Sequence, residues 1–255
     1  MQCCQCQGIE AEFERKAATA ELRQFRRRGP AKTTRMLVDA LKAGGVEGMT
    51  LLDIGGGVGA IQHELLKTGV RTATGVDAST AYIEAARAEA ERLGHGDRVV
   101  FHRGDFVRLA EEIAPSDIVT LDRVVCCYQD MPSLVELSSA RAVKLYGVVY
   151  PRDTWWNRVG LATLNVVRWL RRNPFRVFVH RPEAVEAVIQ DNGLKRRFSA
   201  QTFVWQVVIY ARSASATGDL SEHGRRITFQ THPVSRIMNR SVGPPAHHRT
   251  RGPIV

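Results

Sequence analysis

The sequence lacks any apolar run of the roughly 20 residues that a membrane-spanning helix requires. Its beginning, MQCCQCQGIEAE, also lacks the charged and then apolar layout of a secretion signal. Cysteine is scarce, with 5 in 255 residues, and the odd number argues against a framework of disulfides. We therefore expect a cytoplasmic protein without a transmembrane segment.

The few cysteines form two groups, Cys3, Cys4 and Cys6 near the N-terminus and the adjacent pair Cys126 and Cys127. Thiolates bind soft metal ions, but no second ligand pair has the spacing of a zinc finger. We interpret the N-terminal group as part of a mobile terminus and predict no metal site. The adjacent pair is expected to consist of small buried residues and not of reactive thiols.

Acidic residues are outnumbered by basic ones, 26 against 36, which gives a formal net charge of +10. Residues 1–44 contain 9 Lys/Arg and 5 Asp/Glu, and residues 212–255 contain 7 and 2. The remaining residues 45–211 are almost neutral, with 20 and 19. Basic flanks around a neutral centre are weak support for a polyanionic substrate, so nucleic acid is not the expected partner.

Residues 51–59, LLDIGGGVG, carry the most informative pattern. An apolar run ends at Asp53, a glycine-rich stretch follows, and AIQHELLK continues with helical apolar spacing. A strand, a glycine loop and a helix in this order are typical of a nucleotide-binding turn, because glycine lets the backbone approach a ligand. Gly55, Gly57 and Ala60 also fit the dinucleotide pattern G-x-G-x-x-G/A. Asp53 favours another ligand, since a carboxylate repels a pyrophosphate and suits cationic groups.

With GVDAS at residues 75–79 and GDF at residues 104–106, this loop resembles the class I S-adenosylmethionine-dependent methyltransferases. That cofactor carries a sulfonium and an ammonium group and no phosphate. The resemblance implies that Asp77 accepts hydrogen bonds from the ribose and that Asp105 faces the adenine amino group. The alternative roles are a helix cap for Asp77 and a turn residue for Asp105. The expected cofactor-binding residues are Asp53, Gly55, Gly57, Gly59, Asp77, Ala78, Asp105 and Phe106.

Predicted strands alternate with helical segments after the glycine loop, which indicates a parallel, doubly wound sheet. The further strands are expected at residues 72–76, 98–102, 117–121, 147–150, 194–198 and 202–211. The helices are expected at residues 9–28, 32–42, 79–93, 107–113, 131–145, 154–170 and 182–190. The expected fold is therefore an α/β, Rossmann-like sheet, mostly parallel, with an antiparallel C-terminal strand pair and two N-terminal helices.

The pattern predicts three segments along the chain. Residues 1–44 form an N-terminal helical cap, and residues 45–211 form the S-adenosylmethionine-binding methyltransferase domain. Residues 212–255 are rich in Ser, Gly, Pro, His and Arg and show no periodicity, so a disordered basic tail is expected.

Substrate-side candidates follow the fourth and fifth strands, since ligands of open α/β sheets lie at the carboxyl ends of strands. The predicted catalytic residues are Asp122, Tyr128 and Arg152, with Tyr128 expected near the methyl group. Arg152 precedes Trp155 and Trp156, and a cation beside an aromatic wall suits a flat apolar molecule with a carboxylate. Alternatively, Arg152 pairs with a surface acid and the two tryptophans belong to the core.

The layout from Phe13 to Arg212 resembles, more distantly, the magnesium-protoporphyrin O-methyltransferases. The shared features are a Phe-containing N-terminal helix, an apolar Trp-bearing helix after the fifth strand, and closing strands that end in YAR. This resemblance implies O-methylation of a carboxylate on a flat apolar ring. The loop LDRVVCCYQDM departs from the Asn/Asp-Pro-Pro-Tyr pattern of many methyltransferases that act on amino groups, which counts against amino acceptors.

We therefore predict methyl transfer from S-adenosylmethionine to a small or mid-sized, partly apolar acceptor. Two alternatives remain open: an RNA methyltransferase that uses the basic flanks, and a non-catalytic cofactor-binding module. A NAD-type oxidoreductase is disfavoured by Asp53 and by the absence of a second catalytic domain.

Overall fold

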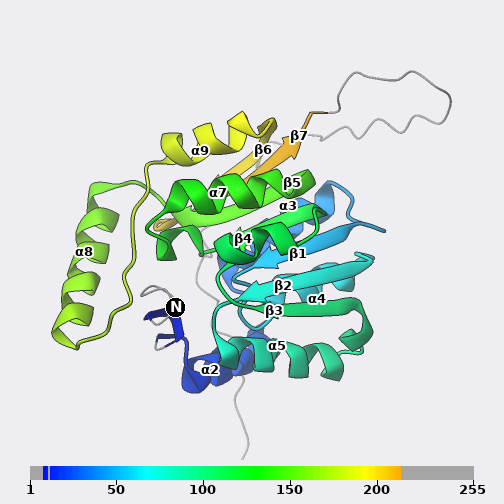
Figure 1. Ribbon diagram of the computed structural model, residues 1–255, viewed down its shortest axis with the longest axis horizontal. Helices are drawn as coiled ribbons and strands as arrows, with labels where there is room; N and C mark the ends of the chain where they lie inside the picture. Colours follow the sequence, from blue (N-terminus) through cyan, green and yellow to red (C-terminus); the bar gives the residue numbers. More distant parts are fainter. Residues whose placement is uncertain (1–7, 11, 214–255) are drawn as a thin grey trace, which may run out of the picture. The chain divides into compact units, whose positions relative to one another are not determined.

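The computed structural model describes residues 8–10 and 12–213, which build a seven-stranded sheet with helices on both faces (Figure 1). The sheet has the order β3-β2-β1-β4-β5-β7-β6. Strands β1 to β5 are parallel, and β7 is antiparallel to both β5 and β6. The predicted fold class is therefore confirmed. The strands are β1 Thr50–Ile54, β2 Thr72–Asp77, β3 Val99–Arg103, β4 Ser116–Asp122, β5 Ala142–Pro151, β6 Leu194–Gln201 and β7 Trp205–Arg212.

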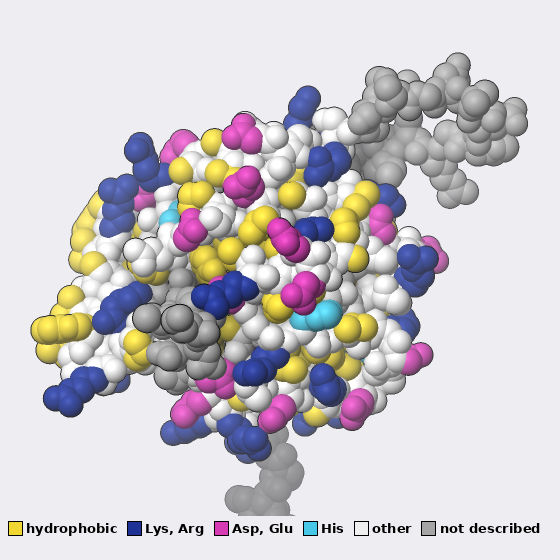
Figure 2. Space-filling model, in the orientation of Figure 1, with side chains coloured by type: hydrophobic (Ala, Val, Ile, Leu, Met, Phe, Trp, Pro, Cys, Tyr) yellow, Lys and Arg dark blue, Asp and Glu magenta, His cyan; other side chains and the backbone are white. Residues whose placement is uncertain are grey.

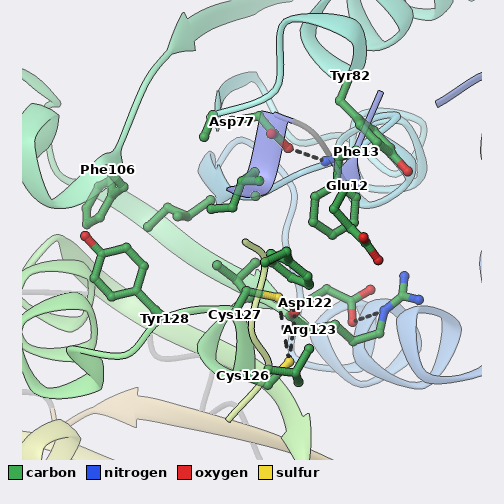
Figure 3. Close-up of a pocket in the computed structure, with 18 of the residues that line it drawn as sticks. Glu12, Phe13, Asp77, Tyr82, Phe106, Asp122, Arg123, Cys126, Cys127 and Tyr128 are labelled. Carbon is green, nitrogen blue, oxygen red and sulfur yellow. Dashed lines mark hydrogen bonds and ion pairs between the residues drawn. The ribbon is translucent and has the colours of Figure 1, made fainter. Parts of the chain in front are cut away.

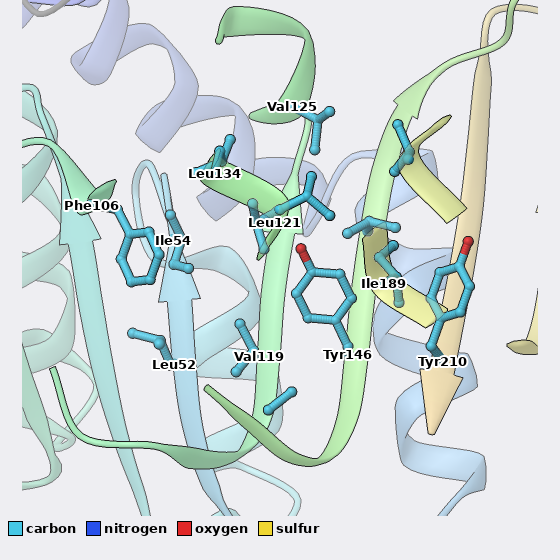
Figure 4. Packing of buried hydrophobic residues seen from close by; sticks show 14 of the residues in the cluster. Leu52, Ile54, Phe106, Val119, Leu121, Val125, Leu134, Tyr146, Ile189 and Tyr210 are labelled. Atoms are coloured by element: carbon cyan, nitrogen blue, oxygen red, sulfur yellow. The ribbon is translucent and has the colours of Figure 1, made fainter. Parts of the chain in front are cut away.

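The sheet separates two apolar cores, one on each of its faces, and helices cover both. Neighbouring residues of a strand point to opposite faces, so Leu51 and Ile118 enter one core while Leu52 and Val119 enter the other. The first core lies under α3, α4 and α5. The second core, part of which Figure 4 shows, lies under α6, α7 and α9. The helices are α2 Arg15–Arg28, α3 Lys32–Ala43, α4 Ala60–Leu66, α5 Thr80–Arg92, α6 Phe106–Leu109, α7 Met131–Ala140, α8 Trp155–Leu170 and α9 Pro182–Asp191.

The largest differences from the predicted boundaries lie at the junction of α7 and β5 and at the start of α2. Helix α7 ends at Ala140, and β5 already begins at Ala142, because β5 pairs along its length with β4 on one side and β7 on the other. The first helix was expected from residue 9, but α2 begins at Arg15. The break lies at Phe13, whose carbonyl accepts a hydrogen bond from Ser79 Oγ at 2.6 Å.

The N-terminal helices share the core of the sheet. Leu37 and Leu41 of α3 are fully buried against β5 and β7, so the expected boundary at residue 44 does not separate two cores. The cysteines at positions 3, 4 and 6 and most of the predicted basic tail lie outside the described residues. No helix in the described part of the chain is long and apolar enough to cross a membrane.

Candidate active site

The glycine loop between β1 and α4 needs glycine for conformation and for space. Gly55, Gly57 and Gly59 have φ of 64°, 56° and 80°, in the left-handed region that disfavours other residues. A Cβ on Gly55 would lie 2.4 Å from Cγ2 of Val124, in the loop after β4. The bare backbone therefore lets the tips of β1 and β4 approach each other.

Asp77, at the tip of β2, joins this loop to the next one. Its carboxylate accepts hydrogen bonds from the Gly57 N–H at 3.1 Å and from the Ser79 N–H at 2.9 Å. The cap of α5 is Ser79 itself, whose hydroxyl accepts a bond from the Tyr82 N–H at 3.3 Å. Burial raises the pKa of Asp77 to about 6. Asp77 is thus a half-buried carboxylate between two loops and not the helix cap.

Asp105, which follows β3, caps α6 by accepting a bond from the Val107 N–H at 3.1 Å. The Tyr128 hydroxyl donates to the same carboxylate at 2.8 Å, and Phe106 lies close to the Tyr128 ring (Figure 3). Tyr128 therefore closes the end of the site that the resemblance assigns to adenine. The sequence predicts Tyr128 beside the methyl group, and the structure shows its hydroxyl bound to Asp105.

The end of β4 places Asp122 and Arg123 at the centre of the site. Asp122 accepts a hydrogen bond from the Thr34 hydroxyl of α3, and Arg123 Nε lies 3.3 Å from its other oxygen. Arg123 has a φ of 63°, which is uncommon for a residue with a side chain and is often found at functional sites. Its N–H donates to the Val149 carbonyl at 2.8 Å and holds this conformation in place.

Cys126 and Cys127 follow in a short turn, and both thiols lie within 3.4 Å of the Arg123 carbonyl, towards which they donate. The interaction with Cys127 and burial raise the pKa of Cys126 above that of an ordinary thiol. Cys126 is therefore a protonated, buried side chain at neutral pH and not a thiolate nucleophile.

Asp53 lies beneath the glycine loop and is only 1% exposed. It accepts hydrogen bonds from Thr120 Oγ1 at 2.7 Å and from Gln62 Nε2 at 3.1 Å. Burial raises the pKa of Asp53 to about 7. Its carboxylate supports the loop from below, so any effect on a cationic ligand acts through space.

The strand tips surround a hollow of about 390 Å³, which is within the range of small-molecule sites (Figure 3). Phe13 covers it and makes edge-to-face contacts with Tyr82 at 5.7 Å and Phe175 at 5.4 Å between ring centres. Beside Phe13, Glu12 forms an ion pair of 2.7 Å with Arg168 of α8. A second hollow of about 290 Å³ adjoins it across Arg123 and lies against α2 and α3.

Eight of the predicted residues line the larger hollow: Gly55, Gly57, Asp77, Ala78, Asp105, Phe106, Asp122 and Tyr128. Asp53 borders only the smaller hollow. Gly59 lines neither and precedes α4 as its cap residue.

Arg152 also lines neither hollow, which corrects its predicted role at the site. Its guanidinium donates to the Thr202 carbonyl at 3.2 Å, so it is turned towards the loop between β6 and β7. The neighbouring Asp153 pairs instead with Arg158. Trp155 is 73% exposed and forms no wall of the site.

The lining residues that the sequence-based prediction missed include Glu12, Tyr82, Arg123 and Arg168. Arg168 had a signal, because Leu161, Leu164 and Arg168 follow the helical spacing of three and four and all line the larger hollow. Nothing in the sequence around Arg123 indicates its left-handed backbone.

Comparisons with known proteins agree with this geometry. Residues 46–155, which contain the glycine loop and the tips of β1 to β5, match the sequence model of a family described as "Methyltransferase domain". The chain contains a methyltransferase domain. The match confirms the predicted enzyme class. The predicted cofactor, S-adenosylmethionine, is supported by similar proteins solved with it or with its demethylated product. Among curated proteins, none matches the sequence of this chain.

Solved structures support the fold of this methyltransferase. Magnesium protoporphyrin IX methyltransferase from Synechocystis PCC 6803, solved with bound S-adenosylhomocysteine, is similar at 22% identity over 71% of this chain and 83% of that one, with a TM-score of 0.58. An O-methyltransferase family protein from Burkholderia thailandensis is similar at 18% identity, over 81% and 63%, with a TM-score of 0.62. An O-methyltransferase family 2 protein from Planctomyces limnophilus, in complex with apigenin, is similar at 16% identity, over 77% and 62%, with a TM-score of 0.59.

Proposed function

We propose that this methyltransferase transfers the methyl group of S-adenosylmethionine to a carboxylate oxygen of a small or mid-sized, largely apolar acceptor. The observation that carries the proposal is Arg168 in the wall of the apolar hollow. Its Nη2 pairs with Glu12, while its Nη1 is buried and has no hydrogen-bond partner among the described residues. A buried donor without a partner is costly, and a ligand oxygen would satisfy it.

The strand tips fit the cofactor. Asp77 would accept hydrogen bonds from the ribose hydroxyls, and Asp105 would accept one from the adenine amino group. Phe106 would pack beside the base. Gly55 and Gly57 line the hollow with backbone alone, which lets a ligand approach the main chain. When bound, S-adenosylmethionine supplies an electrophilic methyl group on a sulfonium.

The remaining wall of the hollow suits an apolar body. Phe13, Leu161, Leu164, Phe175 and Val177 line it between the N-terminal segment and α8. The guanidinium carbon of Arg168 lies 5.0 Å from the centre of the Phe175 ring, so the cation is held against an aromatic face. An acceptor with an apolar ring or chain and one acid group matches this combination. Arg168 thus takes the anchoring role first assigned to Arg152.

A carboxylate acceptor also fits the protonation chemistry of the site. It is ionised at neutral pH and gives up no proton when its oxygen is methylated, so it requires no general base. The described lining of the larger hollow contains no histidine and no lysine. Its acids Glu12, Glu21, Asp77, Asp105 and Asp122 all accept bonds from other groups of the protein.

A methyl-transfer assay tests the nature of the acceptor atom. The protein is incubated with methyl-labelled S-adenosylmethionine and matched sets of apolar carboxylic acids, alcohols and amines. Methyl esters release labelled methanol in mild alkali, whereas methyl ethers and methylamines retain the label. We expect an alkali-labile product from the acids. An alkali-stable product, or label transferred to RNA instead, would contradict the proposal.

Arg168→Lys then tests the anchor. Lysine keeps the charge and can keep the pair with Glu12, but it has no second nitrogen at the place of Nη1 to bind the acceptor. We expect KM for the active acid to rise about tenfold, equivalent to about 1.4 kcal/mol, while cofactor affinity stays unchanged. The matched control is Arg171→Lys. Arg171 is exposed directly after the end of α8, so this substitution should change neither KM nor cofactor affinity.

A further inference from the structure

Helix α8 exposes apolar side chains along one face. The described residues include ten large hydrophobic side chains that are exposed, and seven of them belong to α8. Five are more than half exposed: Trp155 73%, Val159 57%, Val166 55%, Trp169 66% and Leu170 68%. Only Asn157 of this helix is buried. An apolar patch concentrated on one element marks an interaction site.

The exposed residues and the pocket residues of α8 occupy opposite faces. At 3.6 residues per turn, the five exposed residues fall within an arc of about 100°. Leu161, Leu164 and Arg168, which line the hollow, lie on the other side of the helix axis. In Figure 1, α8 stands at the outer edge of the molecule, away from the sheet. One face therefore serves the site, and the other has no partner among the described residues.

The surroundings of the apolar face are basic. Residues 154–182 contain six arginines and no Asp or Glu. Arg158, Arg171, Arg172 and Arg181 are exposed. Among the described residues, only Arg158 of these four forms an ion pair, with Asp153 from outside this stretch. Figure 2 shows hydrophobic side chains at the edge occupied by α8, with Lys and Arg side chains around them.

We propose that α8 docks onto the surface of an anionic lipid bilayer, with its exposed face lying in the headgroup region. Interfacial helices combine an apolar face that carries Trp and Leu with a basic rim. Trp155 and Trp169 lie about 21 Å apart along the helix, and tryptophan prefers the membrane interface. With 16 residues, α8 is about 24 Å long, shorter than the roughly 30 Å core of a bilayer, so it would lie on the surface.

The charge of the patch favours lipid over two other occupants. A second copy of the chain would place the arginines of both helices around one shared interface, where like charges repel. The segment 214–255 is basic as well, with six Arg and two acidic residues. An anionic bilayer complements both the apolar face and its rim, and each arginine near such a surface strengthens attraction.

Vesicle sedimentation of the full-length protein tests the proposal. We expect binding to phosphatidylcholine vesicles that contain phosphatidylserine, much weaker binding to pure phosphatidylcholine, and a decrease with salt. Trp169→Ser combined with Leu170→Ser should lower the partition coefficient at least tenfold. Arg171→Gln combined with Arg172→Gln should reduce the preference for phosphatidylserine by about tenfold.

The matched control is Val100→Ser combined with Val143→Ser, which removes exposed apolar side chains from β3 and β5 and should leave vesicle binding unchanged. Unaltered thermal unfolding and cofactor binding show that each variant is folded. Two results would overturn the proposal: equal sedimentation of the α8 variant and the control, or a dimer in solution that the α8 variant disperses. The first result would show that the exposed face of α8 does not bind the bilayer. The second would show that this face binds another copy of the chain.

Discussion

At the scale of single residues, Asp77 illustrates how a carboxylate becomes available to a ligand. Two backbone N–H groups hold it at the tip of β2, one from each flanking loop. These bonds leave lone pairs free, because a carboxylate accepts about four hydrogen bonds. The side chain also lines the larger hollow. Its position is thus fixed before a ligand arrives.

Asp77→Ala should weaken S-adenosylmethionine binding by about 1–3 kcal/mol, or about 5- to 150-fold, because ribose hydroxyls would lose their acceptor. The fold should persist, since the residue ends a strand. Titration calorimetry measures the affinity. Asp97→Ala, at an exposed site before β3, serves as the control and should bind normally. Unchanged affinity in Asp77→Ala would assign the carboxylate a purely structural role.

Asp53 should make the stability of the ligand-free protein depend on pH. Its pKa is about 7 in the folded protein and near 3.8 when the chain is unfolded, so the folded state holds an extra proton between these values. Stability therefore falls as pH rises through this window, by up to about 4 kcal/mol from this residue. Asp77, whose pKa is raised to about 6, acts in the same direction.

Asp53→Asn removes this titration, so its stability relative to the native protein should be higher at pH 8 than at pH 5. Denaturant unfolding at several pH values provides the difference, which cancels groups common to both proteins. The control is Asp39→Asn, at an exposed position of α3. Its free energy of unfolding should change with pH in the same way as that of the native protein. The same pH dependence for Asp53→Asn would show that Asp53 is ionised throughout.

The positions of residues at the site were predictable from sequence only where the backbone alone decides them. Asp77 and Asp105 follow strands, and strand ends converge in any parallel sheet. Tyr128 and Arg152 also follow strands, yet Tyr128 binds Asp105 and Arg152 binds the Thr202 carbonyl. Such partners depend on tertiary packing between distant segments, which periodicity does not encode.

At the scale of elements, replacing a glycine in the β1–α4 loop has two costs in stability, one from backbone conformation and one from a steric clash. Gly55→Ala should be destabilising through its φ of 64° and through the approach of Cβ to Val124. The first cost is about 1–2 kcal/mol and the second adds about 1–3 kcal/mol. Gly45→Ala supplies the first cost alone, because its φ is 76° and no atom lies within 4 Å of the new Cβ.

A double-mutant cycle with Val124→Ala measures the clash. Gly55→Ala combined with Val124→Ala should recover much of the second cost and none of the first, so the two substitutions should not add. Thermal or denaturant unfolding gives the free energies. Strict additivity would mean that Val124 moves aside freely and that only backbone conformation requires glycine here.

Element types were predictable, and their ends and exposure less so. The predicted helix of residues 131–145 runs past the end of α7 at Ala140 into β5, where Ala142 and Leu145 are buried. Helix α8 was predicted with nearly correct bounds, since its apolar spacing is regular. Periodicity reveals an apolar face without revealing what covers it, and here the described structure leaves that face exposed.

At the scale of the whole molecule, β7 completes the sheet. It pairs with β5 from Trp205 to Ala211 and with β6 from Gln206 to Arg212. Arg212 ends the strand by donating to the carbonyls of Asn192 at 2.6 Å and Ala142 at 2.9 Å. Strand β7 is thus hydrogen-bonded to a neighbour on each side, and Arg212 is the last residue that takes part in this pairing.

A chain of residues 1–213 should therefore unfold at nearly the same temperature as the full chain and bind S-adenosylmethionine equally well. The composition of residues 214–255 has too little apolar surface to offset the entropy of ordering them. Ending the chain at residue 204 is the control: it removes β7, leaves β6 without a neighbour and exposes one edge of β5, so it should not fold. Calorimetric unfolding compares the three chains. A clearly lower Tm for residues 1–213 would show that the tail packs against the fold, because only a docked segment contributes stability that its removal can take away.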